Sequence, residues 1–206
     1  MNNDFFISIL NIIGIIAFAI SGAMKGIKYS LDLLGIIVLG MITAIGGGII
    51  RDVLLNQIPL ILKNEKDLIF ALVASIIPYF FVNKIEKISF LIQLFDALGL
   101  AVFTVIGAAK GMEANIGIFG VIIMGSLTGV AGGMLRDILV GETPFVLKED
   151  VYASFAIAGS LLYYILVKFT FLNKMIIIYG VIILIFIGRF FAIKFKWNLP
   201  KPKDTL

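Results

Sequence analysis

Long apolar stretches, separated by short polar breaks, run along the whole chain of 206 residues. The breaks include KGIKYSLD at 25–32, KNEKD at 63–67 and KGMEAN at 110–115. A membrane-spanning helix takes about 20 apolar residues, so this pattern predicts seven spans. The apolar stretches cover about 5–24, 33–55, 67–82, 88–109, 115–140, 151–168 and 173–195.

The composition indicates the same class of protein. Hydrophobic residues make up 61% of the chain and charged residues 15%, with a mean hydropathy of +1.11. A soluble domain of this size does not need so much apolar surface, so we predict an all-α integral membrane protein, a single transmembrane domain over 1–206. The net charge of +4 requires no nucleic-acid partner.

Several kinds of chemistry are absent from the chain. It contains no cysteine and no histidine, which excludes disulfides, thiolate and imidazole catalysis, and the commonest transition-metal ligands. Nothing in the sequence resembles a nucleophile with its base. We therefore expect neither an enzyme nor a bound metal or cofactor.

The most informative feature is an internal repeat. An offset of 85 aligns residues 11–82 with 96–167 without a gap, and 23 of the 72 pairs are identical. Many identities fall on residues that an apolar composition does not favour: GGGIIRDVLLNQIPLILK at 46–63 matches AGGMLRDILVGETPFVLK at 131–148. Self-similarity of this kind indicates duplication of one structural unit.

Each copy holds three predicted spans. Because three is odd, the second copy must enter the membrane from the opposite side, so the repeats are predicted to be inverted, an arrangement common among transporters. Repeat one covers about 5–82 and repeat two about 88–167. A seventh helix at about 173–195 and a basic tail at 196–206 lie outside the duplication.

Lysine counts predict the orientation. With the N-terminus outside, nine Lys residues lie on the cytoplasmic side and five on the other, which fits the positive-inside rule. The start, MNNDFF, has no basic residue and does not resemble a cleavable signal peptide. We expect a multi-pass protein of the cell (inner) membrane, N-terminus outside and C-terminus cytoplasmic. The nine are Lys25, Lys28, Lys84, Lys87, Lys148, Lys194, Lys196, Lys201 and Lys203.

Glycines interrupt the second span of each copy. Gly46, Gly47 and Gly48 form a triplet that Gly132 and Gly133 repeat, and each glycine costs about 1 kcal/mol in a helix interior. A helix broken there would line a watery path, because irregular backbone at membrane depth needs such surroundings. The alternative is close packing of intact helices on small residues. That role also suits the pairs Gly22 and Gly26, and Gly107 and Gly111.

An Arg-Asp pair follows the glycines in both copies, as Arg51 and Asp52 and again as Arg136 and Asp137. Ionisable groups inside a span are expensive and usually functional. A bend at the glycines would turn these side chains towards the interface between the repeats. Alternatively, each pair ends its helix at the membrane surface, with the charged groups reaching the headgroups.

Asp96 lies well inside the fourth span, and its repeat mate is Asn11. A carboxylate there could coordinate a cation or relay protons, or it could simply be hydrogen-bonded by a neighbouring helix. Lys25 and Lys110 match across the copies at span ends. They are interpreted as flanking anchors or, alternatively, as pore residues.

The doubled pattern F-x-x-x-G-A-x-K-G, then G-G-G-x-x-R-D-x-L with a proline eight residues after the arginine, resembles bacterial members of the trimeric intracellular cation channel (TRIC) family, also known in bacteria as the glycine transporter family. The likeness covers residues 5 to about 195. It implies seven spans, two inverted three-helix repeats and a homotrimer among membrane lipids.

The resemblance also implies a path for potassium or another monovalent cation through each protomer, between the glycine-broken second and fifth helices. The bends would fall at the two glycine runs, with both Arg-Asp pairs beside them. Two departures weaken the symmetry of such a site. Asn11 stands where bacterial relatives usually carry an aspartate, and Ala131 replaces the first glycine of the second triplet.

Two functional classes stay open. Loosened helices that offer backbone carbonyls suit a channel with weak ion sites. A secondary transporter of glycine or another small amino acid would need a closed site that meets a carboxylate with an arginine and an ammonium with a carboxylate, roles that Arg51 or Arg136 could fill with Asp96. A scaffold without transport is a third, weaker alternative.

Overall fold

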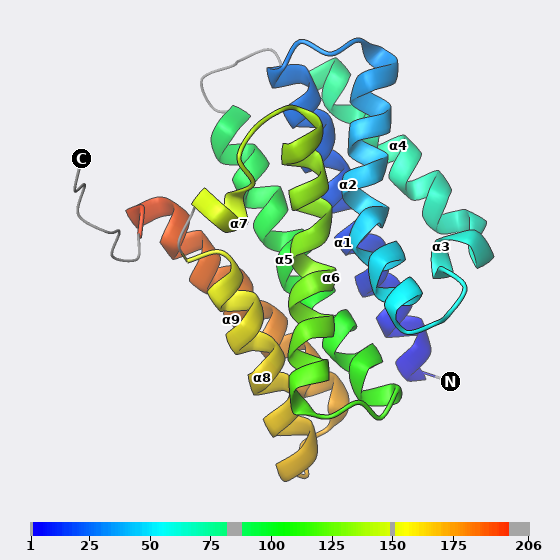
Figure 1. Cartoon of the computed structure of the whole chain (residues 1–206), viewed down its shortest axis with the longest axis vertical. Coiled ribbons are helices and arrows are strands. Elements are labelled where there is room, and N and C mark those ends of the chain that lie inside the picture. Colours follow the sequence, from blue (N-terminus) through cyan, green and yellow to red (C-terminus); the bar gives the residue numbers. More distant parts are fainter. Residues whose placement is uncertain (1, 82–87, 149–150, 198–206) are drawn as a thin grey trace.

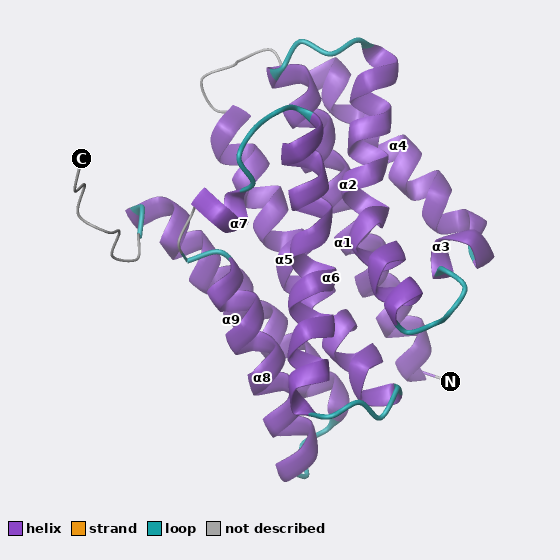
Figure 2. Ribbon diagram, viewed as in Figure 1, coloured by secondary structure: helices purple, strands orange, loops and turns teal. Residues whose placement is uncertain are grey.

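The structure is a computed structural model that describes residues 2–81, 88–148 and 151–197. Over these residues it contains nine helices and no strand (Figures 1 and 2), which confirms the all-α prediction. The basic tail, except Lys196 and Trp197, lies outside the described residues, as do Lys84 and Lys87. The helices are α1 (Asn2–Lys28), α2 (Leu33–Leu54), α3 (Leu60–Lys63), α4 (Glu65–Phe81), α5 (Ile88–Glu113), α6 (Ile118–Leu139), α7 (Phe145–Lys148), α8 (Ala153–Phe169) and α9 (Lys174–Phe195).

Seven of these helices correspond to the predicted apolar stretches. Five of them, α1, α2, α5, α6 and α9, are long and apolar enough to cross a membrane. The other two, α4 and α8, have 17 residues each. At about 1.5 Å of rise per residue, 17 residues make about 25 Å of helix, slightly less than the hydrocarbon thickness of a typical bilayer.

Two short helices were not predicted. Leu60–Lys63 forms α3 and Phe145–Lys148 forms α7, and both lie in segments expected to be loops. The carboxylate of Asp52 accepts a hydrogen bond from the backbone N–H of Leu60 at 2.8 Å. The carboxylate of Asp137 accepts one from Phe145 at 3.1 Å. Each Arg-Asp motif therefore fixes the start of the short helix that follows it.

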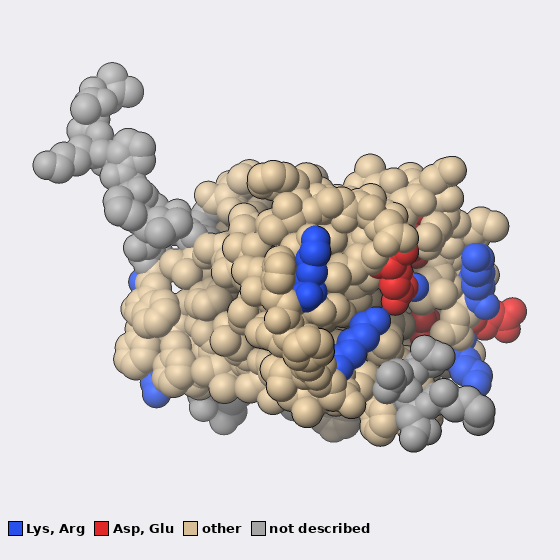
Figure 3. Space-filling view, turned by 90° about the horizontal axis from the view of Figure 1, so that it is seen from below, with Lys and Arg blue, Asp and Glu red and all other residues tan. Residues whose placement is uncertain are grey.

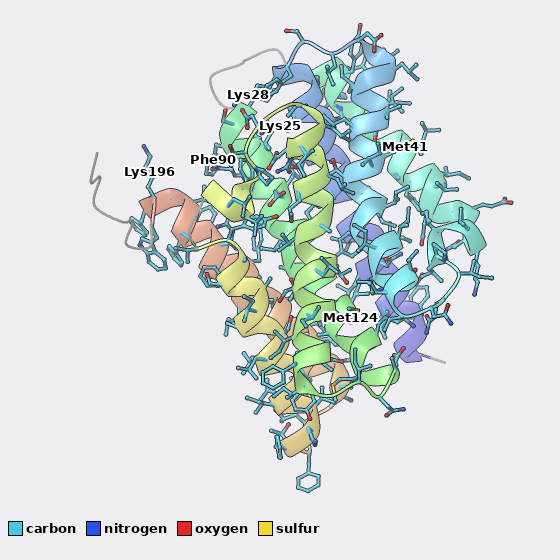
Figure 4. The ribbon with its side chains drawn as sticks, in the orientation of Figure 1. Lys25, Lys28, Met41, Phe90, Met124 and Lys196 are labelled. Carbon is cyan, nitrogen blue, oxygen red and sulfur yellow. The ribbon has the colours of Figure 1, made fainter. Side chains whose placement is uncertain are left out.

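Helices at corresponding positions of the two copies run in opposite directions. In Figure 1, α2 descends while α6 ascends, and α1 ascends while α5 descends. Figure 4 shows the same relation: Met41, in the first half of α2, lies towards the upper end, and Met124, in the first half of α6, lies towards the lower end. The start of α1 and the end of α9 lie towards opposite ends of the bundle (Figure 1).

The expected break at the glycines is wrong, because α2 and α6 continue as helices through both glycine runs. A Cβ atom added to Gly47 would lie 2.2 Å from the backbone oxygen of Thr128. One added to Gly132 would lie 2.2 Å from the oxygen of Thr43. The glycines therefore allow α2 and α6 to pack backbone against backbone, as small residues do between membrane helices.

The other glycine pairs also mark close helix packing. A Cβ atom on Gly22 would meet the hydroxyl oxygen of Thr43 at 2.4 Å, and one on Gly107 would meet that of Thr128 at the same distance. These contacts join the first helix of each unit to the second. Thr43 and Thr128 thus contact glycines on two sides and pin α1, α2, α5 and α6 together.

Candidate functional site

Arg136 is the centre of a fully buried polar cluster near the α7 end of the bundle. Its Nη1 atom lies 2.6 Å from Oδ1 of Asp96 and donates to the hydroxyl of Ser21 at 2.7 Å. Its Nε atom donates to Oδ1 of Asp137 at 2.9 Å. The ring of Phe145, at the start of α7, also lies 4.8 Å from the guanidinium. Residues from four helices, α1, α5, α6 and α7, therefore meet at Arg136.

Lys25 extends the cluster from α1. Its ammonium lies 3.2 Å from Asp137 and 2.6 Å from Glu142, and only 1% of the lysine is exposed. The hydroxyl of Tyr29 donates to the other oxygen of Glu142. The interpretation of Lys25 as a flanking anchor is therefore wrong, because carboxylates 112 and 117 positions away enclose its charge. Figure 4 places Lys25 and Lys28 at the upper end of α1.

The repeat mate Lys110 has a different environment. Its side chain is 40% exposed and pairs with Glu113, three residues further along α5, at 2.9 Å. At the offset of 85, Glu142 corresponds to Gln57. Lys25 thus contacts an acidic residue of the second copy, whereas the equivalent residue of the first copy, Gln57, carries no charge for Lys110 to contact. Lys110 remains a surface charge.

Arg51 forms a smaller cluster near the α3 end. Its Nη2 atom lies 2.7 Å from Oδ1 of Asp52, and its Nε atom donates to the same oxygen at 2.8 Å. Arg51 is 4% exposed and Asp52 is 3% exposed. Both Arg-Asp pairs are therefore enclosed by protein, and the alternative in which they reach the headgroups is wrong.

Asn11 completes this second cluster with a residue that the sequence analysis missed. Its amide donates to Oδ2 of Asp67 at 2.8 Å. Asp67 begins the apolar part of α4 and is 2% exposed. Asp67 ends the polar break KNEKD and was not predicted as a site residue, but its repeat mate Tyr152 is also buried, with its ring 4.7 Å from the guanidinium carbon of Arg189. A comparison of polar positions across the repeat could have identified it.

A cavity of about 320 Å³ adjoins the Arg51 cluster. Figure 3 views the molecule from this end, where acidic and basic side chains lie beside a hollow on a face that is otherwise largely uncharged. The polar side chains that line the cavity include Asn11, Arg51, Asn64, Asp67, Lys110 and Glu113.

The structure thus gathers the predicted ionisable residues, except Lys110, into two clusters. In each of α2 and α6 the Arg-Asp pair follows the glycines, and the two helices run in opposite directions (Figure 1), so the two pairs lie on opposite sides of the glycine contact. Gly133 borders the Arg136 cluster, since an added Cβ would lie 3.0 Å from Asp96. A Cβ atom added to Gly46 would lie 2.6 Å from the side chain of Leu135, and one added to Gly48 would lie 3.9 Å from Nη2 of Arg51. Within the described residues, no three or more His, Cys, Asp or Glu side chains lie close enough together to hold a metal ion jointly.

Comparison with known proteins gives consistent relatives. The family model described as glycine transporter matches residues 8–84 and again 93–168. The inner membrane protein YadS of Escherichia coli is 38% identical over 156 residues, covering 75% of each chain. One solved TRIC cation channel shares 36% identity, with 97% of this chain and 98% of that chain covered and a TM-score of 0.86. The TRIC orthologue from Rhodobacter sphaeroides shares 26% identity, with 93% and 99% covered and a TM-score of 0.88.

Proposed function

Because the chain belongs to the glycine transporter family and shares the fold of TRIC cation channels, we propose that it is a potassium channel with one conduction path in each protomer. The path runs between α2 and α6, past both Arg-Asp clusters. The observation that carries this proposal is the burial of ionisable side chains on both sides of the contact between these two helices. Buried charges inside membrane helices are expensive and mark ion pathways.

The proposed architecture has seven spans. The helices α1, α2 and α4 form one unit, α5, α6 and α8 form an inverted second unit, and α9 is the seventh span. The opposite directions of corresponding helices (Figure 1) and the two matched stretches, which begin 85 residues apart, support this arrangement. One transmembrane domain then includes the whole chain.

The path is closed where Gly47 and Gly132 meet the opposite helix. A contact that leaves no room for a Cβ atom leaves none for an ion. Conduction therefore requires α2 and α6 to separate by a small shift or rotation, a motion that glycines permit because they carry no interlocking side chain. In this proposal the glycines are the hinge of the gate and the arginine clusters are its two vestibules.

The relatives are membrane proteins, and the one from Escherichia coli is an inner membrane protein. We propose the N-terminus outside and the C-terminus in the cytoplasm. Burial of Lys25 in an ion pair removes one of the nine cytoplasmic lysines from the count, and eight against five still favours this orientation. We further propose a homotrimer among membrane lipids, because the similar protein from Rhodobacter sphaeroides is a trimeric intracellular cation channel.

A carrier of glycine or another small amino acid is the second candidate, favoured by the match to the glycine transporter family. Such a carrier needs an arginine with free donors for the carboxylate. The donors of Arg136 are already directed at Asp96, Asp137 and Ser21, so a substrate would have to displace a buried carboxylate. For Arg136 this occupancy favours the channel, whereas Arg51, which pairs with Asp52 and lines the cavity, is the arginine that a carrier would use.

Flux from proteoliposomes separates the two candidates. We expect voltage-driven potassium flux that does not saturate, and no uptake of labelled glycine under glycine or proton gradients. Protein-free liposomes provide the background. Saturable glycine uptake without ionic current would overturn the channel and establish a carrier.

A further inference from the structure

The two copies place an acidic residue at different positions. At the pair 11 and 96 the first copy has Asn11 and the second has Asp96. At the pair 67 and 152 the first copy has Asp67 and the second has Tyr152. The second copy therefore carries this carboxylate on its first helix, whereas the first copy carries it on its third helix. Asn11 and Asp67 are in direct contact, with the amide nitrogen 2.8 Å from Oδ2.

The two clusters also differ in their balance of buried charge. Around Arg136, the cations of Arg136 and Lys25 face the carboxylates of Asp96 and Asp137, and all four are at most 1% exposed. Around Arg51, the single guanidinium faces two buried carboxylates, Asp52 and Asp67. The Arg51 cluster thus contains one more buried carboxylate than cations. An ionised carboxylate without a cationic partner is strongly unfavourable when it is buried, so a cation bound beside Asp67 would stabilise the ionised form.

The oxygen atoms of Asp67 show where that cation would bind. Oδ2 accepts from Asn11, whereas Oδ1 is buried and has no hydrogen-bond partner among the described residues. Asp67 lines the cavity of about 320 Å³, where the side chains of Asn11 and Asn64 offer further oxygens. The space is large enough for a cation that keeps part of its water shell.

Competing charges in the same cavity are already paired. Arg51 is directed at Asp52, and Lys110 lies 2.9 Å from Glu113. Neither cation is within ion-pair distance of Asp67 in the structure. A single carboxylate with amide oxygens makes a weak site that suits a monovalent ion, which a channel must also be able to release.

We propose that Asp67 and Asn11 form a binding site for a monovalent cation at the α3 end of the protein. This inference rests on the proposed function, because the choice of potassium as the bound ion comes from the proposed channel. The other end lacks such a site because Asp96, the counterpart of Asn11, is already paired with the guanidinium of Arg136, and the ammonium of Lys25 is a second tethered cation beside Asp137. The two vestibules are therefore unequal: one binds a mobile cation, and the other contains the buried ammonium of Lys25.

Thermal unfolding of the purified protein in detergent tests the site without requiring flux. A ligand that binds only the folded state raises the Tm. At a potassium concentration about ten times the Kd, we expect a rise of about 4 °C relative to N-methyl-D-glucamine at equal ionic strength. Asp67→Asn should abolish the rise. Glu65→Gln is the matched control, because it removes an exposed carboxylate from the same first turn of α4 and should preserve the rise.

A double variant distinguishes loss of the site from damage to the fold. Asn11→Asp combined with Asp67→Asn returns the carboxylate to the first helix, as in the second copy, and keeps an amide opposite it. We expect this variant to recover the potassium-dependent rise. No potassium effect in the unmodified protein, or an unchanged effect in Asp67→Asn, would overturn the proposal.

Flux measurements then separate this inference from the proposed function. If the unmodified protein conducts potassium and Asp67→Asn has the same conductance and the same thermal response, the channel stands and the Asp67 site fails. If potassium raises the Tm through Asp67 but no current flows, the site stands and the channel fails.

Discussion

The side chains of Arg136 and Asp96 form a fully buried ion pair, with Nη1 of the guanidinium 2.6 Å from Oδ1 of the carboxylate. Forty positions separate the two residues, and they come from α6 and α5. The pair connects the centre of the bundle to the Arg-Asp motif that begins α7. Changes to this pair should therefore affect both stability and conduction.

Asp96→Asn should lower the free energy of unfolding by about 3–5 kcal/mol, because removing one partner of a buried pair leaves the other charge uncompensated. It should also lower cation conductance, since the cluster gains a positive charge. Denaturation in detergent and single-channel recording measure the two effects. Glu113→Gln on the same helix is the control, because Glu113 is about half exposed. Equal stability of Asp96→Asn and the unmodified protein would contradict the buried pair.

Ser21→Ala should destabilise the protein by about 1–3 kcal/mol. The Ser21 hydroxyl accepts from Arg136 at 2.7 Å and donates to the backbone oxygen of Ile92 at 2.9 Å, and the substitution leaves both groups without this partner. Ser126→Ala provides a contrast, because the buried Ser126 hydroxyl has no hydrogen-bond partner in the described structure. In chemical denaturation, Ser21→Ala should have a lower free energy of unfolding than Ser126→Ala. The reverse order would refute the role of Ser21.

Lys25→Met should leave Asp137 and Glu142 without the ammonium that lies between them. In potassium-free buffer we expect a loss of about 3–5 kcal/mol of stability. Potassium should restore part of it, because a mobile cation can replace the tethered one. Unfolding curves in potassium and in N-methyl-D-glucamine give the comparison. The exposed mate Lys110, changed to Met, should alter stability by less than about 1 kcal/mol; equal effects of the two variants would rule out the tethered-cation role.

Gly132→Ala should push α6 away from α2, because its new methyl group would meet the backbone oxygen of Thr43. We expect a destabilisation of about 1–3 kcal/mol, and a higher potassium flux if separation of these helices opens the path. Gly180→Ala in α9 is the matched control. It adds the same atom where nothing lies within 4 Å and should be neutral or slightly stabilising. Unchanged stability and flux in Gly132→Ala would argue against the glycine gate.

The long helices could be predicted from the sequence because membrane spans depend on local apolar content. The expected stretch at 33–55 is the helix Leu33–Leu54, and the one at 173–195 is Lys174–Phe195. The four-residue helices α3 and α7 could not be predicted in this way. Helices so short are not stable on their own, and each depends on a carboxylate eight residues earlier, Asp52 or Asp137.

The glycine runs show a different limit. Glycine in a helix interior indicates either a break or a close contact, and the residues of α2 alone do not distinguish these. The contact depends on Thr128, 81 positions after Gly47. Only the packed structure shows that the glycines are needed for close approach while the helices remain intact.

The sequence by itself determined the helical membrane class, the duplication and the family, since apolar length, self-similarity and motif spacing can all be counted along the chain. The tertiary structure decided which equivalent charges are buried. Lys25 and Lys110 occupy the same position in the two copies, yet one is enclosed and the other is exposed. The physical reason is that an ammonium can leave water only where carboxylates from distant segments surround it, and only the fold brings Glu142 to Lys25.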